Sequence, residues 1–165
     1  MGAVRLKSPT RQIPIPSPRI IPPLDPTFTP PALVNRVLRD LTSQESEPLI
    51  IGLERANNER SYFETRILPE SHPLFEQSLP LVERLLKFLL WQRGAFRVYV
   101  GGAPAVGEYL HEQYRPGGAR AFDAHFMGEQ VYQHPFEVIS CRPIDIPPAC
   151  ELTRNLGRHL DGCRI

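Results

Sequence analysis

The sequence is poor in lysine and has almost no net charge. Only two of its 19 basic residues are lysines, Lys7 and Lys87, and the formal net charge of the 165 residues is +1. A nearly neutral chain has no overall field that would recruit nucleic acid or an anionic membrane, so we expect neither as a partner. The excess of arginine has two explanations, genomic base composition and recognition of carboxylates or phosphates by the guanidinium fork.

Cysteines and long hydrophobic runs are also scarce. The three cysteines, Cys141, Cys150 and Cys163, are an odd number confined to the last quarter of the chain, which is not the pattern of a disulfide-bonded secreted fold. They include no closely spaced pair of the kind that structural zinc sites use, so we expect no metal site, even with His159 nearby. The first 18 residues lack the apolar segment of a secretory signal, and no stretch is long enough to span a membrane. We therefore expect a cytoplasmic protein.

Proline is abundant at the beginning of the chain. Nine of the 19 prolines precede residue 32. Because proline fixes φ and lacks a backbone donor, residues 1–28 are predicted to form an extended, proline-rich arm, partly as polyproline II. The apolar residues of the arm predict that its later half lies along the surface of the following domain. A ligand for a proline-reading domain is the alternative.

Helical and strand patterns alternate after the arm. Asn57-Asn58 suits the positive φ of a tight hairpin turn, Ser78 is a candidate cap for the longest helix, and Gly94 suits its end. The order helix, strand, strand, helix, strand, helix, strand predicts an α/β fold with a mixed sheet and flanking helices. The expected helices are 30–43, capped by Thr29, a main helix within 72–94 and 103–114, and the expected strands are 49–53, 62–67, 96–102 and 135–140. If Ser78 caps the main helix, residues 74–77 form a separate turn. The predicted organisation is an arm (1–28), an α/β domain (29–141) and a connector toward a following module (142–165).

The turn between residues 100 and 104 is the candidate binding site. It leaves a strand and opens a helix, where free N–H groups and the helix dipole attract anions such as phosphate. The candidate ligand-binding residues are Gly101, Gly102 and Ala103, with Arg97 and Arg120 as sources of positive charge. The spacing matches neither the dinucleotide-binding nor the P-loop pattern. Glycine used for turn geometry alone is the simpler interpretation.

No catalytic residue is predicted. Asp123 and His125 could pair a carboxylate with an imidazole, but the sequence has no recognisable nucleophile turn such as GxSxG. A salt bridge between Arg120 and Asp123, or a loop clamp formed by them, is the simpler role for these two side chains.

Four segments together resemble a known group of proteins. They are FETRILPESHP, VERLLKFLLWQRGAFRVYVGGAPAVGEYL, GARAFDAHFMGEQVY and LGRHLDGCRI. The chain, from about the hairpin to its last residue, is similar to the N-terminal region of bacterial ROK-family proteins, which comprise repressors, uncharacterised reading frames and sugar kinases. In that group a segment like LGRHLDGCRI leads into the phosphate-binding loop of an actin-like ATPase fold. The resemblance implies a following sugar-kinase-like module, in this protein or as a partner, with ATP and Mg²⁺ as the cofactors of that module.

The residues of the family's kinase site are not found in this chain. It has no DxGxT-like loop, no Gly-His-Asp motif and no cysteine-rich zinc motif, so no catalytic residue and no cofactor are carried over. The order of the predicted elements resembles one half of an actin-like fold, and in that comparison Glu54 falls near the position of the phosphate loop's Asp. Arg55 and Ala56 stand where that loop has glycines. We expect a non-catalytic N-terminal α/β domain of a ROK-family sugar-kinase-like protein. The alternatives are an independent small-molecule or phosphate-binding domain that uses the Gly101-Gly102 turn, and a protein-interaction module. We predict neither the sugar substrate of the kinase-like module nor whether this chain forms a homo-oligomer.

Overall fold

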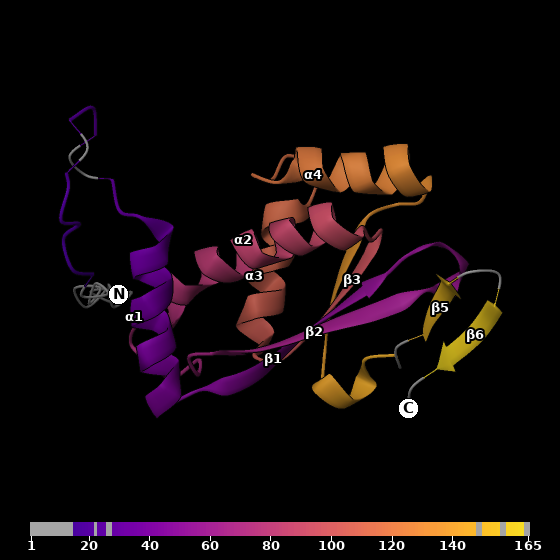
Figure 1. Ribbon diagram of the computed structural model, residues 1–165, viewed down its shortest axis with the longest axis horizontal. Coiled ribbons are helices and arrows are strands. Elements are labelled where there is room, and N and C mark those ends of the chain that lie inside the picture. Colours follow the sequence, from indigo (N-terminus) through magenta and orange to yellow (C-terminus); the bar gives the residue numbers. More distant parts are fainter. Residues whose placement is uncertain (1–14, 22, 26–27, 148–149, 156–157, 164–165) are drawn as a thin grey trace, which may run out of the picture.

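The fold is α/β, with a mixed β-sheet and flanking helices, as the sequence predicts. The computed structural model describes residues 15–21, 23–25, 28–147, 150–155 and 158–163, and describes side chains as far as Pro147. Figure 1 shows the first helix at one end of the molecule and the hairpin of the last two strands at the other.

Within the described residues, the sheet has six strands in the order β4-β3-β1-β2-β5-β6. β1 is antiparallel to both of its neighbours, β3 and β4 are parallel, and β2 meets β5 at a single pair, Arg60 and Cys150. Beyond Arg60, the outer side of β2 is therefore an open sheet edge within the described part of the chain. The strands are β1 (Glu47–Glu54), β2 (Arg60–Ile67), β3 (Arg97–Gly101), β4 (Glu137–Cys141), β5 (Cys150–Asn155) and β6 (Arg158–Cys163).

The turn between β1 and β2 confirms the role predicted for two asparagines. Asn57 and Asn58 both have φ of 59°, the left-handed region that asparagine tolerates better than most residues. The turn is closed by the Arg55 N–H, which donates to the Glu59 carbonyl at 2.8 Å. This bond determines which residues of β2 direct their backbone N–H and C=O groups toward β1.

Four α-helices accompany the sheet in the part of the chain that the structure describes. They are α1 (Pro31–Gln44), α2 (Phe75–Arg93), α3 (Pro104–Tyr114) and α4 (Ala121–His125), and α4 runs on into a π-helical segment (Phe126–Tyr132). Among the described residues, none of the helices has both the length and the apolar character needed to cross a membrane.

Two predicted helix starts are wrong. Residue Pro30, and not Thr29, precedes the first turn of α1. Helix α2 begins at Phe75, so Ser78 lies inside it and donates its hydroxyl to the Phe75 carbonyl at 2.6 Å. Phe75 and Leu79 are both buried in the core, and their packing holds the first turn in place across Pro80. The proline removes only one helical hydrogen bond there.

The main core lies between one face of the sheet and helices α2 and α3. Alternate residues of β1 and β3 point into it, as a half-buried sheet requires. Fully buried members include Leu49, Ile51, Leu53, Leu86, Leu89, Leu90, Val98, Val100, Val106 and Leu110. Helix α3 approaches β4 closely, because Gly107 has no side chain and lies directly against Ser140.

The opposite face of the sheet is crossed by the segment that follows β4. A 3-10 turn (Pro143–Asp145) leads to Ile146, whose side chain lies against Gly52 and Gly101. The hydroxyl of Tyr62 donates to the Pro147 carbonyl. The predicted connector thus begins as a strap across the sheet and then contributes β5 and β6.

The arm differs from its prediction. Ile15 packs against a small second core formed by Leu38, Leu68 and Leu74. Ile20 and Leu24, in the later half, are 84% and 98% exposed. A segment so rich in proline has few backbone donors to bond to the domain. The contact of Ile15 with the second core is made by its side chain.

Candidate functional site

The Gly101-Gly102 turn has the predicted strand-to-helix geometry, but its approach is occupied. A Cβ atom at Gly101 would lie 2.5 Å from Ile146 Cδ1 and 3.0 Å from Pro143 Cα, and one at Gly102 would lie 3.1 Å from Leu49 Cδ1. Neither glycine has a positive φ. Glycine is required here because neighbouring chain segments pack directly on the backbone, in the space where a ligand would approach.

The two candidate arginines lie elsewhere. Arg97 begins β3 whereas Gly101 ends it, a separation of roughly 13 Å along an extended strand. Arg97 binds Glu54 and Glu137, and Arg120 binds Glu83. Ala103 is buried at the start of α3. The structure brings Gly101, Gly102 and Ala103 together, and it does not bring either guanidinium to them.

This geometry predicts that phosphate ligands do not stabilise the protein. With ATP, glucose 6-phosphate or inorganic phosphate at millimolar concentration, we expect an unchanged melting temperature, because a ligand that binds the folded state would raise it by mass action. Differential scanning fluorimetry measures this directly. A concentration-dependent rise that Gly102→Val abolishes would restore the turn as a binding site.

Four charged residues form a row across four strands. From β2 to β4 they are Arg60, Glu54, Arg97 and Glu137, and we call them the charge ladder. Glu54 accepts from Arg60 Nε at 3.0 Å, from Arg97 Nη1 at 3.0 Å and from the Tyr99 hydroxyl at 2.8 Å. Arg97 Nε donates to Glu137 at 2.7 Å. The carboxylate of Glu54 is therefore saturated with donors although its residue is only 4% exposed.

The surroundings of Glu54 keep it ionised. Burial acts to raise its pKa, but the hydrogen bonds from Tyr99 and Arg60 and the charges of Arg60 and Arg97 outweigh burial and lower it. Burial and the same hydrogen bond raise the pKa of Tyr99. A carboxylate held in this way is a poor proton acceptor, so the ladder serves the architecture of the sheet. Sequence reasoning noticed Glu54 but found none of its partners.

The other two buried carboxylates are also paired. Asp123 accepts from Trp91 Nε1 at 2.8 Å and lies 3.4 Å from Lys87 Nζ. Glu83 accepts from Arg120 Nε. The predicted Arg120–Asp123 salt bridge is therefore wrong, because α2 supplies a nearer carboxylate for Arg120. These contacts tie α2 to α4.

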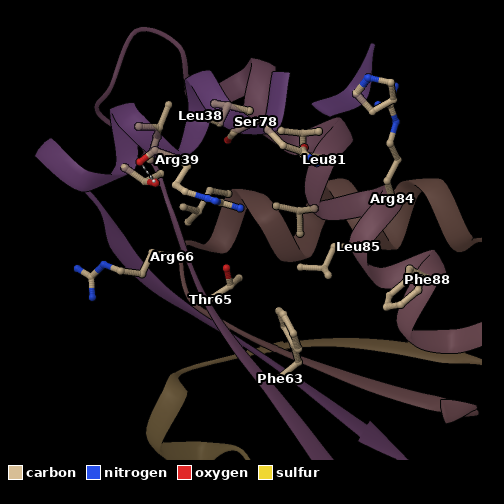
Figure 2. A pocket seen from close by; sticks show the side chains of 16 residues that line it. Leu38, Arg39, Phe63, Thr65, Arg66, Ser78, Leu81, Arg84, Leu85 and Phe88 are labelled. Carbon is tan, nitrogen blue, oxygen red and sulfur yellow. Dashed lines mark hydrogen bonds between the residues drawn. The ribbon is translucent and has the colours of Figure 1, made fainter. Parts of the chain in front are cut away.

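A groove that sequence reasoning missed lies beside the sheet. It has a volume of about 760 Å³ and lies between α1, β2 and α2 (Figure 2). We call it the α1–α2 groove. Its apolar floor includes Phe63 from β2 and, from α2, Leu81, Leu85 and Phe88. This floor is partly open to solvent, since Phe88 is 60% exposed.

Arginines line the groove. Arg39 from α1, Arg66 from β2 and Arg84 from α2 are among its lining residues, and no Asp or Glu is. Figure 2 shows Arg39 extending over the groove from α1 and Arg66 pointing away from it. Arg66 donates to the hydroxyl and the carbonyl of Ser46 at 2.7 and 3.0 Å. The groove is thus an apolar surface with a positive rim.

Comparisons with known proteins do not identify a family. No protein-family model matches the chain, and no curated protein and no solved structure is significantly similar to it. Within the described residues, no group of three or more His, Cys, Asp and Glu side chains could hold a metal ion. The side chains of Cys150, His159 and Cys163 lie outside that description.

Proposed function

We propose that this chain is a non-catalytic N-terminal α/β domain that precedes and packs on a ROK-like sugar-kinase module. The family part of the proposal rests on the four similar segments, of which LGRHLDGCRI resembles the family's approach to its phosphate loop. In the proposal, ATP and Mg²⁺ are cofactors of that module only.

The non-catalytic part rests on one observation. All three buried carboxylates of the described chain, Glu54, Glu83 and Asp123, are bound to cationic or hydrogen-bonding side chains of the same fold. A general base needs a free lone pair within reach of its substrate. Carboxylates that tie strands and helices together support a structural role for this domain.

The proposal predicts no sugar-kinase activity in the purified chain. With ATP, Mg²⁺ and a panel of hexoses and amino sugars, we expect ADP release no higher than without sugar, because the residues that would position a phosphoryl acceptor are missing from the sequence. A coupled ADP assay measures this, with a known sugar kinase as the positive control. Sugar-dependent ADP release that survives stringent purification would contradict the non-catalytic role.

The family part has a separate test in the coding sequence. We expect the codons after Ile165 to encode an apolar strand with an Asp and one or more glycines, which is the phosphate loop of the family. A stop codon followed by unrelated sequence would remove the support for a kinase-like neighbour and leave the interaction-module alternative.

A further inference from the structure

The open edge of β2 presents main-chain groups next to the α1–α2 groove. Residues of an antiparallel strand point their N–H and C=O groups alternately toward one neighbour and toward the other. The Arg55–Glu59 bond fixes this alternation, so Phe63 and Thr65 bond to β1 whereas Tyr62, Glu64 and Arg66 point outward. The Tyr62 carbonyl accepts from Arg93 Nη1 at 3.2 Å, as expected for an outward group.

The outward groups of Glu64 and Arg66 have no strand to pair with in the described part of the chain. Strand β5 meets β2 only at Arg60. Edge strands with unpaired N–H and C=O groups are templates for an added strand, and several recognition domains use them in this way.

The β2 edge offers main-chain groups to a peptide, and the α1–α2 groove offers a surface for the peptide's side chains. In an added strand every second side chain would point to the helix side of the sheet. On that side lie the half-buried side chains of Phe63 and Thr65, and beyond them the stripe of Leu81, Leu85 and Phe88 on α2. Apolar side chains at alternate positions of the added strand would fit this floor.

Charge selects the side chains that reach the rim of the groove. Arg39 from α1 and Arg84 from α2 line the groove, no acidic side chain does, and the Arg66 side chain points away and is bound to Ser46 (Figure 2). Guanidinium groups bind carboxylates in paired geometry, and a groove of one sign favours a ligand of the other. From these observations we propose that the β2 edge and the α1–α2 groove bind an extended acidic peptide segment of a partner protein, whose groove-facing side chains are apolar over the floor and acidic at the rim.

Two occupants from the chain itself fit less well. The first 12 residues contain Arg5, Lys7 and Arg11 and no acidic residue, so they carry the same sign as the groove. A second copy paired through the same edge would bring the groove arginines Arg39 and Arg84 of both copies together. Like charges placed against each other disfavour both arrangements.

The test uses a labelled peptide and four protein variants. The probe is an acetylated and amidated peptide of about eight residues, the length of a typical strand, whose groove-facing alternate positions are Glu, Val, Val and Glu and whose other positions are serine. Fluorescence anisotropy should show saturable binding to the full chain. Glu64→Pro removes one outward N–H without touching the bonds to β1, and it should weaken binding roughly ten-fold or more. Glu64→Ala keeps the N–H and should bind at least as well as the original protein.

The arginines are tested separately. Arg39→Gln combined with Arg84→Gln should weaken binding roughly ten-fold and reduce its sensitivity to salt. Arg115→Gln is the matched control, because Arg115 binds only its helical neighbour Glu112 and should leave binding unchanged. In the unaltered protein, the peptide should slow hydrogen exchange at the amides of Glu64 and Arg66, which does not depend on any variant folding.

Several results would overturn the proposal. They are absence of saturable binding, equal binding by Glu64→Pro and Glu64→Ala, and equal affinity for the same peptide with lysine in place of glutamate. Unchanged exchange at Glu64 and Arg66 on peptide binding would exclude strand addition. So would a self-associated dimer that Glu64→Pro dissociates, because the edge would then belong to a second copy.

Discussion

Replacement of Glu54 by alanine is expected to lower the free energy of unfolding by about 3 kcal/mol, because buried cationic donors lose their acceptor. Glu54 joins Arg60, Arg97 and Tyr99, which come from the strands on both sides of β1. Urea denaturation followed by circular dichroism measures the loss. Glu112→Ala is the matched control, since its exposed pair with Arg115 should contribute less than about 1 kcal/mol. Equal effects of the two substitutions would show that the charge ladder adds nothing to stability.

The same carboxylate gives stability a pH dependence of known sign. The pKa of Glu54 in the folded protein lies below its ordinary value of 4.5. Its contribution is therefore fully present above pH 4.5 and is lost as the pH falls toward the folded-state pKa. The original protein should lose stability more steeply below pH 4.5 than Glu54→Gln does. Parallel curves for the two proteins would contradict the assignment.

Gly107→Val should lower the free energy of unfolding by roughly 2 to 3 kcal/mol through overpacking. A Cβ atom at Gly107 would collide with the side chain of Ser140, and α3 cannot retreat without opening the core around Val106 and Leu110. The same denaturation experiment measures the effect. Glu108→Val is the control, because it places the same side chain on the exposed side of the same helix.

The double variant identifies the cause of that loss. Ser140→Gly removes the atoms that Gly107→Val would strike, so the two substitutions together should cost less than the sum of their separate effects. Strict additivity would mean that the close approach of α3 and β4 is not the reason for glycine at position 107.

Local patterns predicted the fold well because each uses neighbours in the chain. Asn57 and Asn58 tolerate positive φ wherever they occur, and the alternation of β1 needs only its own residues. The start of α2 was mispredicted for a tertiary reason. The burial of Phe75 in a core built largely by later strands and helices extends the helix through Pro80, and no local rule contains that contact.

The candidate site was less predictable because it depends on contacts that are distant in sequence. The strand-to-helix turn at Gly101 is visible in the sequence, but the side chain of Ile146 that covers it comes from another segment. Pairing Glu54 with Arg97 requires the order of β1 and β3 in the sheet. The α1–α2 groove is a gap between three elements, and its only sequence signal, the extra apolar side chains on α2, is also the signal of a buried helix.

The charge ladder also distinguishes the native strand alignment from a shifted alignment that would still bury the apolar side chains. Sliding a strand by one residue would turn its apolar side chains to the wrong face, but a slide by two residues keeps every side chain on its own face. Moving β3 by two residues against β1 would put Tyr99 opposite Glu54 in place of Arg97. Glu54 would then lose a cation while still buried. The charge ladder thus favours the native alignment of the strands. Removing it should permit misaligned strands during refolding and should also make the native state less stable.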